Sequence, residues 1–214
     1  MAVINLRNKE IQCKIVYYGP GRSGKTSSLV YVYNTLQSKV KSKMVIIKTE
    51  EEKTLFFDFF PLSLGKIQNF DIKLQLYTVP GQIMYASTRR LILKGVDGII
   101  FVADSQFTKR KENIESIRDL EESLKNEKLS LSNIPLVFQY NKRDLAKEDM
   151  HLLSVEDLEY DLNNSFKAPY FLTSAIRGYG VTNALRTISK LIIQYVSNKF
   201  ARSRITKEEI YAGR

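Results

Sequence analysis

The sequence predicts an α/β fold of three layers, in which a mostly parallel, six-stranded sheet carries helices on both faces. Segments typical of strands alternate along the 214 residues with segments whose apolar side chains recur at helical spacing. The run Gly98–Asp104 is apolar almost throughout, which is typical of a strand covered on both faces. Polar or glycine-rich loops follow several strands, and the length fits one domain with a sizeable core.

The expected elements follow one another in a regular order. Apolar or alternating runs predict strands at residues 11–18, 44–47, 70–78, 98–104, 135–140 and 170–173. Helices are predicted between them around Leu29, Leu91, Ile117 and Ile188, where apolar residues lie three and four positions apart. Ser154–Asp157 resembles a capping box, which would open a further helix.

The composition limits the classes of partner and chemistry. Lysine and arginine exceed the acidic residues by 33 to 23, and the net charge of +10 favours polyanionic ligands, acidic proteins or anionic lipid. Nucleic acid is disfavoured, because no recognition helix, aromatic stacking platform or zinc pattern accompanies the charge. The single Cys13 allows no internal disulfide, and the single His151 argues against histidine-based catalysis or a multi-histidine metal site. No signal peptide or membrane-length apolar run is recognisable, so a cytoplasmic protein is expected.

Residues 19–26, Gly-Pro-Gly-Arg-Ser-Gly-Lys-Thr, fit the pattern G-x-x-x-x-G-K-S/T between a predicted strand and a predicted helix. Glycines let successive N–H groups point inward as a nest for phosphate, and the helix dipole adds positive charge there. Lys25 would reach the β- and γ-phosphates, and the Thr26 hydroxyl would ligate Mg²⁺. A glycine-rich turn without a ligand is the alternative, which this context disfavours. The expected phosphate-binding residues are Gly19, Gly21, Arg22, Ser23, Gly24, Lys25, Thr26 and Ser27.

Residues 141–144, Asn-Lys-Arg-Asp, fit the pattern N-K-x-D at the carboxyl end of a predicted strand. An ionised Asp144 can accept two hydrogen bonds, from the ring N–H and the exocyclic amino group of guanine. Adenine offers neither, so its binding would leave the carboxylate unpaired. The Lys142 stem can lie along the purine face, and Asn141 can tie this loop to the phosphate loop. After the last strand, Ser174 and Ala175 can supply a backbone N–H to the guanine carbonyl oxygen.

Taken in order, these motifs together with Thr54 and Thr78–Gln82 resemble those of Ras-like small GTPases. More narrowly, Thr-Val-Pro-Gly-Gln at 78–82 is similar to the bacterial gliding-motility GTPases of the MglA type. The resemblance implies a P-loop NTPase G domain over residues 1–198 that alternates between GTP and GDP states and uses Mg²⁺. It also implies a roadblock-fold, MglB-like GTPase-activating partner, effectors in cell polarity or gliding motility, and recruitment to the poles of a bacterial cell.

The same resemblance implies roles at the site of hydrolysis. Gln82 would orient the attacking water, and Thr54 would sense the γ-phosphate through its hydroxyl and the metal. Thr78 and Gly81 would lie against the nucleotide. Thr26 and Thr54 are the implied metal ligands.

Two positions depart from the resembled pattern. Most small GTPases have an aspartate where Thr78 stands, so the carboxylate that ordinarily holds a metal-bound water is missing. Lys53 stands where the resembled family has an arginine, and lysine keeps the charge but loses the planar, two-pronged donor set. Because an arginine finger contributes roughly 10³ to 10⁵ in rate, we expect slow hydrolysis without a partner. Arg22 is a weaker substitute, since an exposed arginine is usually solvated.

Two segments leave alternatives open. Leu55–Phe60 contains four phenylalanines, which are either core residues of a strand or a partner-docking surface in one nucleotide state. Residues 199–214 form a basic tail, in which Thr206–Glu209 could cap a short helix. This tail is either solvated or makes a weak contact with an acidic protein or an anionic membrane. The alternative functions are a GTP-loaded scaffold with little turnover and, less favoured, an RNA-associated GTPase.

Overall fold

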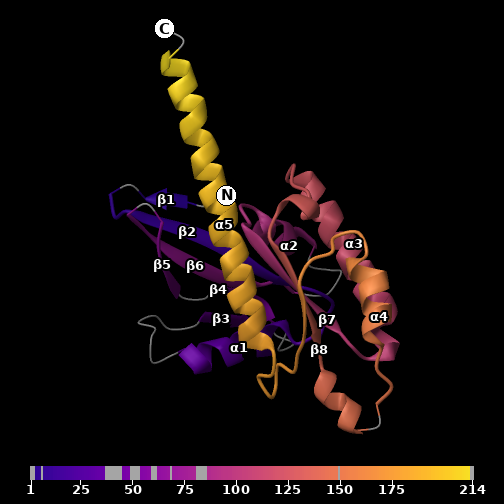
Figure 1. Cartoon of the computed structure of the whole chain (residues 1–214). Coiled ribbons are helices and arrows are strands. Elements are labelled where there is room, and N and C mark those ends of the chain that lie inside the picture. The colour runs from indigo at the N-terminus through magenta and orange to yellow at the C-terminus, as the bar shows by residue number, and fades with distance from the viewer. Residues whose placement is uncertain are drawn as a thin grey trace.

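The computed structural model describes residues 3–5, 7–36, 45–48, 54–58, 62–67, 69–80, 86–148 and 150–212. Within these ranges, the side chains of residues 3–4, 45–48, 54–58, 62–67, 86–88 and 199–212 are not described. Figure 1 shows a twisted central sheet with helices on both faces, which is the three-layer α/β arrangement that the sequence predicts.

The central sheet has seven described strands in the order β5-β6-β2-β7-β8-β9, with β1 paired to β2 beside this path. Five neighbouring strands, from β6 to β9, run parallel, and β1 and β5 are antiparallel to their neighbours. The strands are β1 Val3–Asn5, β2 Glu10–Tyr18, β5 Leu62–Ile67, β6 Phe70–Thr78, β7 Gly98–Asp104, β8 Leu136–Asn141 and β9 Tyr170–Leu172.

The predicted count of six strands was wrong for this sheet. Strands β1 and β5 were not expected, because a three-residue strand and a short run that contains a glycine carry little alternation of their own. Conversely, the strand expected at residues 44–47 is β3 Val45–Lys48, and the segment Leu55–Phe60, for which a strand was one alternative, overlaps β4 Thr54–Asp58. These two pair with each other in a separate antiparallel sheet.

Two apolar layers cover the faces of the central sheet. On one face, α1 Lys25–Leu36 and α5 Val181–Ala212 pack on odd-numbered residues of β2, such as Ile15 and Tyr17. On the other, α2 Ala86–Leu93 and α3 Arg110–Asn126 pack on residues such as Phe101. Strands β7 and β8 are buried along their whole length, as expected of parallel strands between two helical layers.

Short helical segments lie between the longer elements. They are 3₁₀ turns at Phe107–Lys109, Leu131–Asn133 and Arg143–Glu148, the four-residue helix α4 Val155–Leu158, and a π-helical turn at Glu159–Asn163. The Ser154 side chain accepts a hydrogen bond of 2.9 Å from the Asp157 backbone N–H, so the predicted helix start at this place is confirmed.

Helix α5 is longer than the sequence analysis predicts. It runs without a break from Val181 to Ala212, so Thr206–Glu209 lie inside it and do not cap a separate short helix. The physical reason is that no glycine or proline interrupts residues 181–212, while Gly213 follows directly. The assignment of residues 199–214 to a tail outside the G domain stays a prediction.

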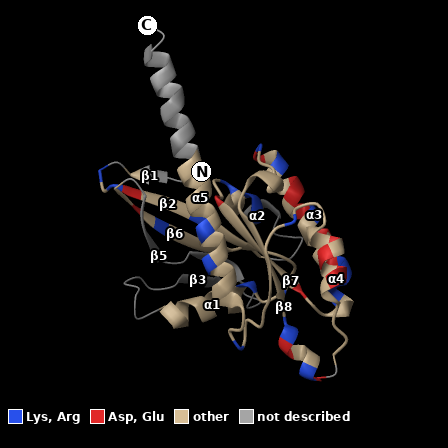
Figure 2. Ribbon diagram, viewed as in Figure 1, with Lys and Arg blue, Asp and Glu red and all other residues tan. Residues whose placement is uncertain are grey.

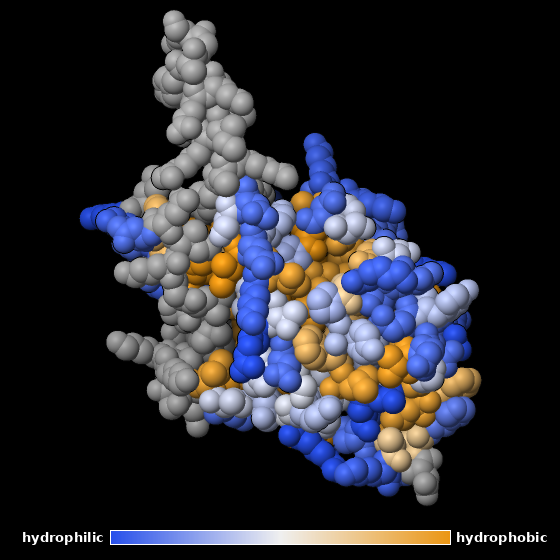
Figure 3. Space-filling view, in the orientation of Figure 1, coloured by the Kyte–Doolittle hydropathy of each residue, from blue (hydrophilic) through white to orange (hydrophobic). Residues whose placement is uncertain are grey.

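Over residues 181–198, helix α5 has one face exposed to solvent and one face packed on the sheet. Exposed residues recur three or four positions apart, at Asn183, Arg186, Lys190 and Gln194, and Figure 3 shows a hydrophilic stripe where α5 lies. In Figure 2, lysine and arginine are spread over several elements and are mixed with acidic residues along α3. Within the described residues, no helix combines the length and the apolar character that crossing a membrane requires.

Candidate nucleotide-binding site

The loop between β2 and α1 needs glycine at two positions. Gly19 has φ 139°, and a Cβ there would lie 2.2 Å from the Val102 carbonyl oxygen. Gly24 has φ 101°, and a Cβ there would lie 2.1 Å from Asn141 Nδ2. Both values are in the region that favours glycine, and both backbones approach a neighbour too closely for any side chain. The loop that the sequence marks for phosphate is therefore pressed against the ends of β7 and β8.

Lys25 is folded back over this loop. Its Nζ donates to the carbonyl oxygens of Gly19 at 2.8 Å and Pro20 at 2.6 Å, and only 7% of the residue is exposed. Burial, and to a smaller extent the nearby charge of Arg89, lower the pKa of Lys25 from 10.5 to about 7. The Ser23 hydroxyl beside it is buried without a hydrogen-bond partner among the described residues. The cradle thus contains an ammonium group and a hydroxyl that an anionic ligand with several oxygens would satisfy.

This shifted pKa would make the binding of a phosphate-bearing ligand depend on pH. A bound phosphate favours the charged ammonium, so the pKa of Lys25 is higher in the complex than in the empty site. The lysine contribution to affinity is therefore complete below about pH 7 and declines as the pH rises toward the pKa of the complex. We expect binding to take up close to one proton at about pH 8.5 and little at about pH 6, measured calorimetrically in two buffers of different ionisation enthalpy. Equal heats in both buffers at the higher pH would contradict this.

Arg89 connects helix α2 to the strand that precedes the phosphate loop. Its guanidinium pairs with the Asp119 carboxylate of α3 through Nε at 3.0 Å, while Nη2 lies 3.3 Å from the other carboxylate oxygen. The Tyr18 hydroxyl donates to the same carboxylate. Burial first, and then the hydrogen bond to Asp119, raise the pKa of Tyr18, so the phenol stays a donor. Sequence reasoning missed this cluster, because its members lie 30 to 101 positions apart.

Asn141 joins the phosphate loop to the two loops expected to read the base. Its Nδ2 donates to the Ser23 carbonyl oxygen at 2.7 Å. Its Oδ1 accepts from the Thr173 hydroxyl at 3.1 Å and from the Ala175 backbone N–H at 2.9 Å. Asn141 is 1% exposed, so these bonds form in a dry environment where unpaired groups would be costly. The tie between loops that the sequence predicts is therefore present in the fold.

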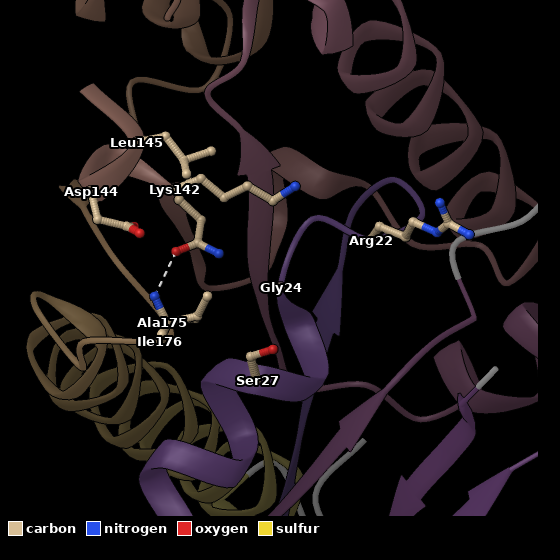
Figure 4. A pocket seen from close by; sticks show the side chains of 9 residues that line it. Arg22, Gly24, Ser27, Lys142, Asp144, Leu145, Ala175 and Ile176 are labelled. Carbon is tan, nitrogen blue, oxygen red and sulfur yellow. Dashed lines mark hydrogen bonds between the residues drawn. The ribbon is translucent and has the colours of Figure 1, made fainter. Parts of the chain in front are cut away.

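A pocket opens beside Asn141, and most of its lining was predicted from the sequence. Figure 4 shows the Asp144 carboxylate pointing toward the space that Lys142 and Ala175 border. Sequence reasoning did not single out Leu145 and Ile176, whose apolar side chains have no motif of their own. The lining residues are Arg22, Gly24, Ser27, Asn141, Lys142, Asp144, Leu145, Ala175 and Ile176.

Three expected site residues lie at the edges of this arrangement. The Arg22 side chain is exposed and points away from Asp144 in Figure 4, as a solvated side chain does. Gly21 belongs to the loop itself and is partly buried. Ser174 is 2% exposed, and its hydroxyl accepts from the Arg177 N–H at 3.2 Å, so this side chain shapes the loop around Ala175.

The residues implied in hydrolysis are placed only in part. Lys53, Gly81 and Gln82 lie outside the described residues, and Thr54 begins β4 with its side chain not described. Of the four phenylalanines of Leu55–Phe60, Phe56 and Phe57 lie in β4 with their side chains not described, and Phe59 and Phe60 lie outside the described residues. Both interpretations of that segment therefore stay predictions.

The surroundings of Thr78 allow a test of whether a metal ion fits. The Val79 N–H donates to the Tyr17 carbonyl oxygen at 3.2 Å, which holds the end of β6 beside the strand that leads into the phosphate loop. The Thr78 hydroxyl is buried there without a hydrogen-bond partner among the described residues. No group of three acidic, histidine or cysteine side chains is gathered in the described parts of the chain. The unpartnered Thr78 hydroxyl fits a water or a phosphate oxygen of a bound Mg²⁺–phosphate group as its missing partner.

Comparison with known proteins agrees with this geometry. A sequence model of the Ras family matches residues 14–194. The mutual gliding-motility protein MglA of Myxococcus xanthus (strain DK1622) is 46% identical over 193 residues, which cover 90% of this chain and 96% of that protein. The Ras-family match spans the phosphate loop, Thr78–Gln82 and Asn141–Asp144.

Proposed function

Because this chain belongs to the Ras family of small GTPases, we propose that it acts as a guanine-nucleotide switch that controls cell polarity or gliding motility. Hydrolysis of GTP to GDP is the reaction of this family, and the family implies GTP, GDP and Mg²⁺ as ligands. The observation that carries the proposal is the position of Asn141, which bonds at once to the phosphate loop and to the loop of Ala175. Motility is proposed from the similarity to MglA, whose name states that role.

The chain's own residues divide the work of binding. Asp144 accepts the two guanine N–H groups, and the Lys142 stem covers the purine face. The Ala175 N–H donates to Asn141 Oδ1 and the Ser174 N–H to the Tyr179 carbonyl oxygen, so the N–H that the sequence analysis assigns to the guanine carbonyl oxygen has to exchange its present partner for the base. Lys25 leaves its backbone acceptors for the β- and γ-phosphates, because a phosphate oxygen is the stronger partner for an ammonium group. Bound Mg²⁺ neutralises phosphate charge, and the hydroxyls of Thr26 and Thr54 would hold it.

In the proposed hydrolysis, Gln82 orients the attacking water and Lys53 supplies the positive charge that the resembled family takes from arginine. We therefore propose slow intrinsic turnover and acceleration by a roadblock-fold, MglB-like partner in the cytoplasm of a bacterial cell. Recruitment to the cell poles and a weak contact of residues 199–214 with an acidic protein or an anionic membrane belong to the same proposal.

Nucleotide extraction followed by chromatography tests the binding function, and guanine nucleotide is the expected product. Phosphate release under multiple turnover, with and without the partner, then separates the switch from a GTP-loaded scaffold. A rate that stays negligible with the partner would favour the scaffold. Among the residues that Figure 2 colours by charge, lysine and arginine are spread over several elements and mixed with acidic residues, which does not favour the RNA-associated alternative.

Lys53→Arg is expected to raise the partner-stimulated rate of GTP hydrolysis, by about 10-fold to 10³-fold in single turnover. Arginine would restore the planar fork that can contact two oxygens of the transferring phosphoryl group. Lys109→Arg is the matched control, because Lys109 pairs with Glu112 on the surface of the second layer and should leave the rate unchanged. An unchanged single-turnover rate of GTP hydrolysis in Lys53→Arg would contradict the proposal that Lys53 takes the place of a catalytic arginine.

A further inference from the structure

Lys142 is held in an unusual conformation at the wall of the pocket. Its backbone has φ 66°, a left-handed value that is uncommon for a residue with a long side chain. The Nζ atom lies 2.6 Å from Asp104 Oδ2 and 3.2 Å from Gln106 Oε1. Lys142 also lines the pocket beside Asp144. The four-carbon stem therefore lies at the pocket wall, while the ammonium group at its end is bonded to Asp104 and Gln106.

Asp104 is the fixed end of this contact. It is the last residue of β7 and is 0% exposed. Its backbone N–H donates to Asn113 Oδ1 at 2.9 Å, and its carbonyl oxygen accepts from Asn113 Nδ2 at 2.8 Å. Its other carboxylate oxygen accepts from the Gln106 N–H at 3.1 Å. Asn113 is itself 1% exposed on α3. Because Asn113 holds the backbone of Asp104 and the Gln106 N–H holds one carboxylate oxygen, Asp104 presents its other carboxylate oxygen to Lys142 from a fixed position.

Fixing the ammonium group also restricts the stem. A free lysine side chain has large rotamer entropy, which is lost when it is ordered against a ligand. When the ammonium group is bound before the ligand arrives, less freedom is lost on binding. The buried Asp104 carboxylate in turn needs its cation, since breaking a buried pair leaves an uncompensated charge.

We propose that Asp104 is a positioning residue, which holds the Lys142 stem across the base pocket and thereby slows release of the guanine nucleotide. The inference rests on the proposed binding of guanine nucleotides at this pocket. Nucleotide retention would then depend on the end of β7, which Asn113 of α3 supports, as well as on the loop that reads the base.

The test is a double-mutant cycle on the release of a fluorescent GDP analogue from the full-length protein. Asp104→Asn keeps the shape and an acceptor for Gln106 but removes the charge, and it should speed release about tenfold. Lys142→Met keeps an apolar stem but removes the ammonium group. If Asp104 acts through that group, Asp104→Asn should change release less than about twofold in the Lys142→Met background. Glu112→Gln, which breaks a surface pair with Lys109, is the control that should leave release unchanged.

The release rates test both the positioning role of Asp104 and the proposed binding of guanine nucleotides. Equal acceleration by Asp104→Asn in both backgrounds would overturn the positioning role, because a general structural effect does not need the ammonium group. If Asp104→Asn does not fold, Lys142→Met alone still decides, since unchanged GDP release in that variant would also overturn the role. A wild-type protein that does not retain the GDP analogue would overturn the proposed function together with this inference.

Discussion

Asp144→Asn is expected to convert a site for guanine nucleotides into one that prefers xanthine nucleotides. The carboxylate offers two acceptors to the ring N–H and the exocyclic amino group of guanine. An asparagine amide offers one acceptor and one donor, which suits xanthine, because xanthine has a carbonyl oxygen in place of that amino group. With guanine, the amide N–H₂ would face another donor. We expect affinity for GTP to fall by a factor on the order of 10³.

Competition of GTP, XTP and ATP for the site measures this change. Asp157→Asn is the matched control, because this carboxylate lies on the surface at the start of α4, outside the pocket lining. The control should keep its preference for GTP. Unaltered GTP affinity in Asp144→Asn would show that the residue does not read the base, and would remove the basis for guanine selectivity.

Gly24→Ala is expected to abolish tight nucleotide binding. The added Cβ would lie 2.1 Å from Asn141 Nδ2, and the backbone has φ 101°. Either the loop moves or Asn141 gives up its bond to the Ser23 carbonyl oxygen, which joins the phosphate loop to the base pocket. We expect affinity for GDP to fall at least about a hundredfold, since backbone strain and a lost buried hydrogen bond add together.

Titration with a fluorescent GDP analogue and thermal unfolding with and without GDP measure the effect of Gly24→Ala. Gly95→Ala separates strain from the site, because Gly95 has φ 74° but lies in the turn after α2, away from the pocket lining. We expect this control to unfold at a lower temperature while it keeps its affinity. Retained GDP affinity in Gly24→Ala would mean that the contact between the two loops is not needed for binding.

The local motifs of this protein could be predicted from the sequence because they depend on spacing along the chain. Residues 19–26 and 141–144 each follow a strand, and parallel strands bring their carboxyl ends to one edge of the sheet. The meeting of Asn141 with the phosphate loop follows from this rule and from the chemistry of its amide. Long apolar strands such as β7 and β8 were predictable as well, since burial on both faces leaves a run without alternation.

The tertiary structure decided whatever depends on partners distant in sequence. Strand β5 exists through its pairing with β6, and β3 pairs with β4 instead of extending the central sheet. The contacts of Asp104 with Lys142 and of Arg89 with Asp119 join residues 38 and 30 positions apart. No local pattern encodes such pairs. The sequence thus determined which chemistry this chain carries, and the packing of α3 and the strand ends decided how the side chains that perform it are held, because burial fixes geometry only when the surrounding elements are in place.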